Sequence, residues 1–446
     1  MAVSKYRLPL HSQIFIGMIV GILGGIIVKY TVGDKEIIGR IIAWIAPVGD
    51  IFMNFIFMMV IPLILSALTM GVSEVGDLGK LGRLGWKMLR YTIIVTAISV
   101  FIGLALVTIV QPGKSLSIEN REALSRQYEE KAEKIQSDAV TAKERSIGEI
   151  ITNIVPRNPI AEMVYAFDPG HRGGGLLAVM FFSLVLGIAL ASSDQEKVKP
   201  VKDFLAGLYE VVMKVIQFAM KLAPFGVAAL LFELTVELGI SILMVLLQYV
   251  LLVIGALALH MFVTYSLILK YFSGMSPMRF FRDIKEVMVT AFSTSSSNAT
   301  LPIAIKTSIE KLRIKKDISH FVLTIGSTAN QNGTALYEGI TVLFLAQCFG
   351  VELDMYDQII VLVTCILAGV GTAGVPGGSL PVIVLILISV GVPGKSIALI
   401  YGVDRILDMC RTVLNVTGDL TAAAYINHSE NKHLQEKAPD SESTAY

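Results

Sequence analysis

The chain has 446 residues, of which 54% are hydrophobic and only 16% are charged. A soluble protein would carry about 25% charged residues, so this composition excludes an ordinary soluble domain. A formal net charge of +1 gives no electrostatic basis for binding nucleic acid. The three cysteines lack metal-site spacing and the histidines are scattered, so no cluster predicts an enzyme. The composition predicts a membrane protein.

Long apolar segments account for this composition. A helix needs about 20 largely apolar residues to cross a hydrocarbon core that is about 30 Å thick. Segments that meet or approach this length cover residues 12–32, 41–72, 91–110, 175–191, 238–269, 321–349 and 359–392. Several are too long for one upright helix and contain Gly or Pro, which predicts tilted or interrupted spans. The first segment has no cleavage pattern of a signal peptide, so we expect it to be a transmembrane helix.

Basic residues predict the orientation, because short cytoplasmic loops are enriched in Lys and Arg. Lys5 and Arg7 place the N-terminus in the cytoplasm, and further basic loops occur at 80–90, 197–202, 270–285 and 311–316. Residues 112–150 are strongly polar, and we expect them to form a solvated extracellular insertion. The polar tail 428–446 is expected to be cytoplasmic and disordered. We expect the protein in a bacterial or archaeal plasma membrane.

Two polar runs lie at membrane depth. Residues 290–302 read TAFSTSSSNATLP and residues 369–381 read GVGTAGVPGGSLP. Irregular backbone cannot face lipid, because its polar groups would lack hydrogen-bond partners. Each run is therefore predicted to form the tip of a re-entrant hairpin, and interrupted segments in two halves are typical of inverted-repeat transporters. The second run also contains G-x-G-x-x-G, but it lacks the strand and helix that a dinucleotide site requires.

The segment 401–419 combines apolar residues with ionisable ones. Its polar residues recur at steps of three or four and therefore share one helical face: Asp404, Asp408, Arg411, Thr412, Asn415 and Asp419. One reading is a buried polar network that locks helices together. We favour a substrate or ion path, because ionisable residues within the membrane usually mark one. Arg is the natural partner of a carboxylate, and Asp of an ammonium group.

A third polar interruption lies at 326–338, which reads GSTANQNGTALYE. We expect the helix to unwind at residues 330–332, which would make backbone carbonyls available to a cation. A simple cap or kink is the alternative, because Asn-Gly is a common turn.

Taken together, four motifs resemble the glutamate transporter family of cation-coupled symporters. They are the serine-rich STSSSN at 293–298, NQNGT at 330–334, GTAGVPG at 371–377 and DMCRTVLNVTGD at 408–419. The resemblance implies an all-α polytopic membrane protein with eight transmembrane helices, two re-entrant helical hairpins and inverted repeats. It also implies a homotrimer that works as an elevator and is surrounded by membrane lipids.

The resemblance further implies a division into two domains. Residues 1–85 and 151–236 would form the scaffold, with helices 1–2 and 4–5. Residues 86–111 would form helix 3 of the transport domain. The rest of that domain, 237–427, would hold helix 6, hairpin 1 at about 276–312, helix 7, hairpin 2 at about 356–392 and helix 8.

By the same resemblance, Arg411 would bind the side-chain carboxylate of the substrate and Asp408 its amino group. The remaining substrate residues would be Thr334, Thr412, Asn415, Ser295, Ser297 and the backbone of Val375 and Gly377. An acidic amino acid, glutamate or aspartate, is the expected substrate. Dicarboxylates or neutral amino acids are the alternatives.

For cations, the resemblance implies one site formed by Asp419 with carbonyls near Gly326, Asn330 and Asn415. A second site would use carbonyls of Thr328, Gly369, Val370 and Thr372. A third sodium site is expected to be lost, because Asn332 replaces its aspartate and Val95 one of its hydroxyls. No other cofactor is expected.

Glu338 stands where the mammalian relatives carry a proton. A carboxyl enclosed in an apolar helix can take up and release a proton, although a permanently hydrogen-bonded carboxyl is the alternative. We therefore expect proton coupling to dominate over sodium coupling. Arg405, one turn before Asp408, is a candidate for the second arginine that some relatives place elsewhere.

Overall fold

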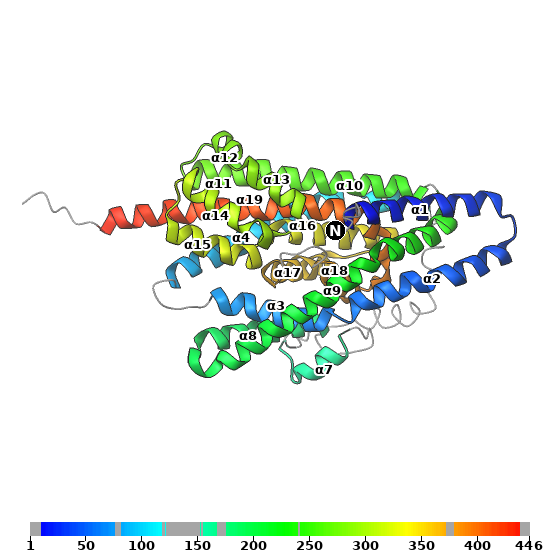
Figure 1. Ribbon diagram of the computed structural model, residues 1–446, viewed down its shortest axis with the longest axis horizontal. Coiled ribbons are helices and arrows are strands. Elements are labelled where there is room, and N and C mark those ends of the chain that lie inside the picture. The colour runs from blue at the N-terminus through cyan, green and yellow to red at the C-terminus, as the bar shows by residue number, and fades with distance from the viewer. Residues whose placement is uncertain are drawn as a thin grey trace, which may run out of the picture.

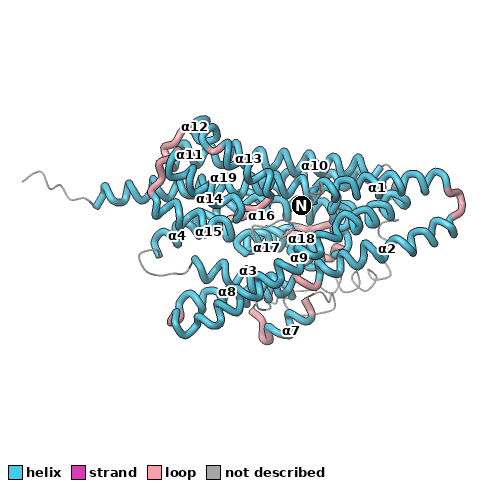
Figure 2. The backbone as a smooth tube through the Cα atoms, in the orientation of Figure 1, coloured by secondary structure: helices cyan, strands magenta, loops and turns pink. Residues whose placement is uncertain are grey.

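The computed structural model describes residues 10–75, 82–117, 121, 152, 155–166, 175–239, 241–371 and 379–437. Within these ranges the protein is all-helical, with short loops and no strand (Figure 2). The elements are α1 (Leu10–Thr31), α2 (Lys35–Phe57), α3 (Val60–Val75), α4 (Gly82–Val110), η1 (Pro112–Ser115), α7 (Pro159–Val164), α8 (Gly175–Ser192), α9 (Gln195–Leu238), α10 (Ser241–Leu259), η2 (His260–Thr264), α11 (Tyr265–Phe272), α12 (Pro277–Asp283), α13 (Lys285–Thr294), α14 (Ser297–Glu310), α15 (Lys316–Ala329), α16 (Asn332–Cys348), α17 (Met355–Gly371), α18 (Leu380–Ser389), η3 (Gly394–Ile397) and α19 (Ala398–Lys437).

Within the described part of the chain, four helical stretches are long and apolar enough to cross a membrane: Ser12–Thr31, Arg83–Ser115, Gln195–Val236 and Ile242–Phe272. Three shorter apolar helices accompany them. The expected span at 41–72 is divided between α2 and α3 by a turn at Met58 and Met59. Pro62 explains the break, because it has no N–H to donate to the carbonyl of Met58.

One group of helices assembles around α9, which packs against α1, α2 and α3, while α8 packs against α3 (Figure 1). Glycines in α1 permit the closest of these approaches. A Cβ atom at Gly17 would lie 2.1 Å from the carbonyl oxygen of Pro224, and one at Gly21 would lie 2.3 Å from that of Ala228. Small residues of this kind let two helices in a membrane protein pack backbone against backbone.

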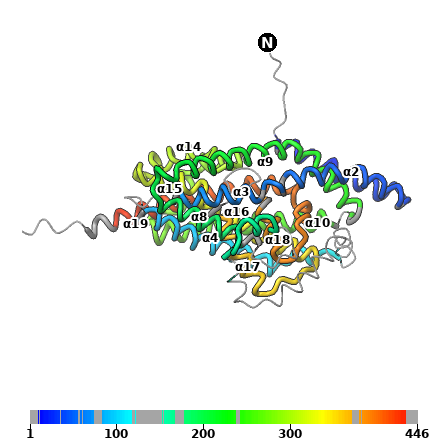
Figure 3. Tube along the Cα trace, turned by 90° about the horizontal axis from the view of Figure 1, so that it is seen from below, coloured from blue at the N-terminus to red at the C-terminus, as the bar shows by residue number. Residues whose placement is uncertain are grey.

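A second group of helices surrounds α16, which packs against α4, α17 and α19. Nearly every residue of α16 is buried. The long helix α19 also contacts α10, α11, α13, α14 and α15, so it runs through the interior of this group (Figures 1 and 3). Its polar face therefore meets several helices at once, and this places the candidate site.

Both polar runs fall at junctions between consecutive short helices. Ser295 and Ser296 join α13 to α14. Ser295 adopts a left-handed conformation with φ 49°, and the Ser296 hydroxyl caps α14 by accepting a 3.2 Å hydrogen bond from the Ala299 N–H. The other junction, between α17 and α18, includes residues 372–378, which lie outside the described residues. That these pairs are re-entrant remains a prediction.

The polar tail corrects one expectation. We expected residues 428–446 to be disordered, but α19 continues to Lys437, and only 438–446 lie outside the described residues. The reason is an anchor to α4: Glu430 forms ion pairs of 2.6 Å with Arg83 and 2.7 Å with Lys87. Burial alone raises the pKa of Glu430, but the hydrogen bonds from Arg83 and Lys87 outweigh it and hold the pKa below its usual value. Most of the expected insertion 112–150 lies outside the described residues.

Candidate functional site

The predicted polar face of α19 is a buried one. Its six polar residues are at most 4% exposed: Asp404, Asp408, Arg411, Thr412, Asn415 and Asp419. The helix repeat places them along one side, and the surrounding helices α13 to α16 cover that side. Charged groups buried this deeply require partners within the protein.

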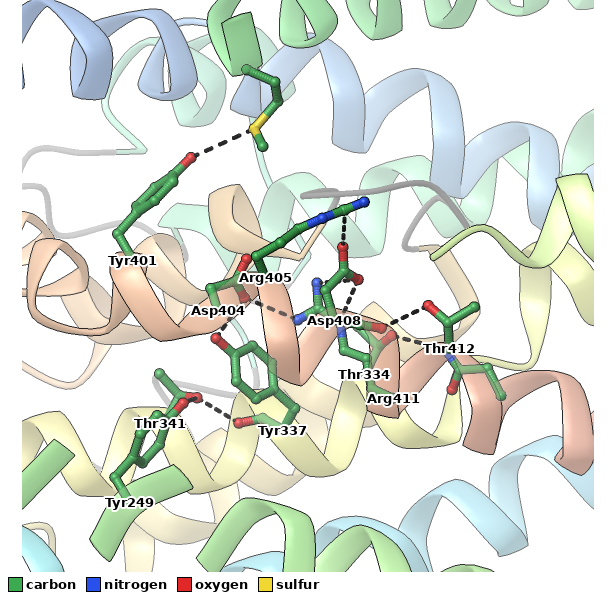
Figure 4. A network of polar contacts seen from close by, with 12 residues as sticks. Tyr249, Thr334, Tyr337, Thr341, Tyr401, Asp404, Arg405, Asp408, Arg411 and Thr412 are labelled. Carbon is green, nitrogen blue, oxygen red and sulfur yellow. Dashed lines mark hydrogen bonds and ion pairs between the residues drawn. The ribbon is translucent and has the colours of Figure 1, made fainter. Parts of the chain in front are cut away.

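Arg411 is held by two carboxylates (Figure 4). Its Nη2 lies 2.9 Å from Asp408 Oδ1 and its Nε donates to the same oxygen over 3.0 Å. Its Nη1 lies 3.5 Å from Asp404 Oδ1. The side chain of Arg411 is 3% exposed, so this guanidinium is a fixed cation in the protein interior.

Tyr337 of α16 contacts both Arg411 and one of its aspartate partners. Its hydroxyl donates a 2.7 Å hydrogen bond to Asp404 Oδ1, and its ring centroid lies 4.6 Å from the guanidinium carbon of Arg411. The series of hydrogen bonds continues through Thr341. Its hydroxyl donates to the Tyr337 carbonyl over 2.7 Å and lies 2.7 Å from the Tyr249 hydroxyl. Tyr337, Thr341 and Tyr249 were not predicted from the sequence. The spacing of Thr334, Tyr337 and Thr341 along one face of an apolar helix was the available signal.

Arg405 approaches Asp408 from the opposite side. Its Nη1 lies 3.2 Å from Asp408 Oδ2, while its Nε is buried without a hydrogen-bond partner in the described structure. Asp408 is thus shared between two arginines. The cluster holds two arginines and two aspartates, so its formal charges balance.

The helix break between α15 and α16 lies beside Asp419. The predicted unwinding at 330–332 is confirmed for Asn330 and Gln331, whereas Asn332 is the first residue of α16. Asn330 Nδ2 donates a 2.8 Å hydrogen bond to Asp419 Oδ1, and the Thr92 hydroxyl donates to Asn330 Oδ1 over 3.1 Å. Gly326 is so close that a Cβ atom there would lie 2.5 Å from Asp419 Oδ1. Carboxylate, amide and carbonyl oxygens are the ligands that hard cations prefer.

Asn415 connects this break to the first turn of α16. Its Oδ1 accepts a 2.7 Å hydrogen bond from the Gly333 N–H. Its Nδ2 donates to Thr334 Oγ1 over 3.1 Å and to Gln331 Oε1 over 2.5 Å. Gln331 in turn donates its backbone N–H to the Gly369 carbonyl over 3.0 Å, which ties the break to the end of α17.

Both polar atoms of the Asn332 side chain are hydrogen-bonded at the position where the resemblance expects an aspartate. Its Oδ1 accepts from Thr96 over 2.7 Å, and its Nδ2 donates to the Tyr265 hydroxyl over 3.2 Å. Val95 is buried and contributes no polar atom. Ser99, which the sequence analysis did not single out, donates to the Asn332 carbonyl over 3.0 Å.

Three further predicted residues are buried without hydrogen-bond partners in the described structure. They are Glu338, with both carboxyl oxygens, and the hydroxyls of Ser295 and Ser297. Unsatisfied buried polar atoms are uncommon and often mark a binding or transfer site. Of the other predicted residues, Thr372, Val375 and Gly377 lie outside the described residues, Val370 is described only as part of α17, and the Thr328 hydroxyl donates to the Ile325 carbonyl over 3.0 Å.

Comparison with known proteins gives consistent results along almost the entire chain. The model of the sodium:dicarboxylate symporter family matches residues 10–429. A "Proton/sodium-glutamate symport protein" of Bacillus caldotenax is 35% identical over 434 residues, covering 97% of both chains. A "Proton/glutamate-aspartate symporter" of Escherichia coli is 33% identical, covering 98% of this chain and 96% of its own. "Excitatory amino acid transporter 3" of Oryctolagus cuniculus is 29% identical, covering 97% and 88%.

Proposed function

This chain belongs to the sodium:dicarboxylate symporter family, as its motifs led us to expect, and we propose that it is a secondary active symporter of acidic amino acids driven by a cation gradient. Glutamate and aspartate are the substrates. The observation that carries this proposal is Arg411, a buried guanidinium held between Asp404 and Asp408. The names of the bacterial relatives, which are glutamate or glutamate–aspartate symporters, support it.

The ion pairs explain how an acidic amino acid is recognised. The side-chain carboxylate of the substrate takes hydrogen bonds from Arg411, and Asp408 is released from Arg411 to bind the substrate ammonium group. One zwitterion with an extra carboxylate satisfies both partners of the broken pair. A dicarboxylate would leave Asp408 with Arg405 alone, and a neutral amino acid would leave Arg411 with Asp404 alone. A buried charge that loses a partner is destabilised.

The charge of the site explains the need for a cation. The cluster of Arg411, Arg405, Asp404 and Asp408 balances formally, whereas an acidic amino acid adds one net negative charge. At least one cation must therefore enter with the substrate to keep the buried site neutral. Two places suit it: the oxygen cluster around Asp419, Asn330 and Gly326 for sodium, and the Glu338 carboxyl for a proton. We propose that the proton is the main coupling ion; sodium coupling is the alternative.

For the architecture, we propose a homotrimer of elevator carriers in a bacterial or archaeal plasma membrane, with both termini in the cytoplasm. The scaffold comprises residues 1–85 and 151–236, and the transport domain comprises 86–111 and 237–427. The separate packing of α9 with α1–α3 and of α16 with α4, α17 and α19 supports this division. The pairs α13–α14 and α17–α18 are the two re-entrant hairpins.

The direct test is uptake by the purified protein in proteoliposomes with imposed gradients of protons or sodium, each applied alone. Labelled glutamate and aspartate should accumulate against their gradients, and excess succinate or alanine should compete poorly. Accumulation of succinate or alanine in place of the acidic amino acids would contradict the proposed substrate. Substrate-independent currents without accumulation would indicate a channel.

A further inference from the structure

Helix α9 carries an unusual charged surface within a long apolar helix. It has 44 residues, which corresponds to a length of ~66 Å. A hydrocarbon core of about 30 Å accommodates less than half of this. The first half of α9 holds Asp203 and Glu210, whereas Lys221 is the only charged residue between positions 215 and 232. The apolar part begins just after Lys214, so Lys214 lies at the edge of the membrane core and Lys221 two helical turns within it.

The two lysines lie on the outer face of α9. The opposite face is buried against α1, α2 and α3 through Met213, Ile216 and Ala223. On the outer face, Lys214 and Lys221 are exposed together with Phe218, which is 50% exposed. Figure 3 shows α9 along one edge of the helix bundle. This face is therefore available to lipid, apart from any contact with another copy of the chain.

Both ammonium groups converge on the same aromatic ring. Lys214 Nζ lies 5.9 Å and Lys221 Nζ lies 5.3 Å from the centroid of Phe218. In the described part of the chain neither lysine forms a hydrogen bond or an ion pair with a carboxylate. An aromatic ring attracts a cation but carries no net charge. The two positive charges, one at the edge of the membrane core and one two helical turns within it, thus have no ion-pair partner in the described structure, which is costly in an apolar environment.

We propose that Lys214, Phe218 and Lys221 form a binding site for the phosphate of an anionic phospholipid. The two ammonium groups pair with phosphodiester oxygens, and the acyl chains lie along exposed apolar side chains such as Phe225, which is 68% exposed. Basic groups between transmembrane helices near the cytoplasmic surface bind anionic headgroups by this chemistry. The basic start of α9, with Lys197, Lys199 and Lys202, places the site in the cytoplasmic leaflet.

Lipid binding by the purified, delipidated full-length protein tests this site. Phosphatidylglycerol and phosphatidylcholine are added separately in detergent, and retained lipid is counted by native mass spectrometry. Each lysine near an anionic headgroup adds to the free energy of lipid binding. Loss of both charges in the double variant Lys214→Gln/Lys221→Gln should therefore weaken phosphatidylglycerol binding about thirtyfold. Lys270→Gln is the matched control, because Lys270 also lies over one ring, that of Tyr271 at 5.2 Å, but shares that ring with no second lysine among the described residues. It should retain nearly full binding.

Further measurements distinguish the phosphate of a lipid from free phosphate as the bound anion. Lys214→Arg/Lys221→Arg keeps both charges and should bind phosphatidylglycerol like the parent protein, and it remains informative if the glutamine variant does not fold. Inorganic phosphate should not displace the lipid. Equal phosphatidylglycerol binding by the parent and the glutamine variant would overturn the proposal. So would a glutamine variant that loses its oligomeric state while keeping its lipid, since the lysines would then face carboxylates of a second copy. None of these readouts depends on transport.

Discussion

The ring of Tyr337 lies under the guanidinium of Arg411, while the hydroxyl of the same tyrosine donates to Asp404, which is itself an ion-pair partner of Arg411. One residue of α16 thus fixes both the cation and one of its counter-ions. The substrate carboxylate can meet a guanidinium in a defined orientation only while this support is intact. Fixed donors recognise an anion better than mobile ones, because less conformational freedom is lost on binding.

The substitution Tyr337→Phe is expected to weaken glutamate binding while the protein still folds. It keeps the ring under Arg411 but removes a hydrogen bond to a charged group, which contributes about 2 kcal/mol. If the whole contribution of this hydrogen bond is lost from the free energy of substrate binding, the KM for glutamate rises about thirtyfold. Tyr249→Phe is the control, since its hydroxyl lies 2.7 Å from the Thr341 hydroxyl and, in the described structure, donates to neither aspartate that holds Arg411. Equal effects of the two substitutions would show that Tyr337 supports packing and not the orientation of Arg411.

Replacing Arg411 tests the substrate assignment itself. In Arg411→Cys the substrate carboxylate has no partner, and breaking a buried charge pair costs about 2–5 kcal/mol. Transport of glutamate and aspartate should therefore disappear, and a neutral amino acid such as serine or alanine should become a substrate. Arg411→Lys keeps the charge but cannot form two parallel hydrogen bonds, so it should retain a weak activity. Unchanged affinity for glutamate and aspartate in Arg411→Cys would refute the assignment.

The sequence could predict those parts of the site that lie within single helices. The face of α19 from Asp404 to Asp419 follows from helix periodicity, and the break at 330–332 follows from Asn-Gly in an apolar helix. Contacts between helices could not be predicted in this way. Tyr337 and Asp404 are 67 positions apart, and their hydrogen bond depends on how α16 packs against α19.

The third cation site shows the same limit. The resemblance implies that Val95 replaces a hydroxyl of that site, but the position of Ser99 beside the Asn332 carbonyl depends on the packing of α4 against α16. The tail was misjudged for a related reason. Its polar composition is typical of disorder, whereas the ion pairs of Glu430 with Arg83 and Lys87 are contacts between distant segments.

The substitution Asn332→Asp is expected to increase the dependence on sodium. It introduces a carboxylate among the hydroxyls of Thr96 and Tyr265, and a carboxylate with hydroxyl oxygens suits a hard cation. Without sodium this buried charge is uncompensated, so uptake in sodium-free buffer should fall, and added sodium should restore it. The control is Asn332→Ala, which removes the amide without adding a charge. Sodium-independent uptake by Asn332→Asp would show that these oxygens do not bind the ion.

An ion pair between the two proposed domains is expected to slow transport. Lys395 Nζ lies 2.6 Å from Asp50 Oδ1 and so joins η3 to α2. Under the proposed elevator mechanism, this contact must break when the proposed transport domain moves. Because the pair is half-exposed, it contributes at most about 1 kcal/mol, so Lys395→Gln should raise the turnover number up to about fivefold.

The exchange Asp50→Lys/Lys395→Asp should return the turnover number towards the parent value. Arg40→Gln is the control, because the Arg40–Glu36 pair lies within α2 alone. An unchanged turnover in Lys395→Gln would mean that the contact survives the transport cycle.

The last prediction concerns Glu338 and the coupling ion. This carboxyl is fully buried in α16, and neither oxygen has a hydrogen-bond partner in the described structure. A proton is the simplest counter-charge for a carboxylate in such surroundings. If Glu338 carries the coupled proton, glutamate uptake by the parent protein should persist in sodium-free buffer and rise with an inward proton gradient. Glu338→Gln, which resembles the permanently protonated form, should lose this stimulation while still binding glutamate and exchanging it across the membrane. Exchange separates the two steps, because it requires movement of the loaded carrier but no release of the proton. Strict dependence on sodium, together with an unchanged pH profile in Glu338→Gln, would assign the coupling to the oxygen cluster around Asp419 instead.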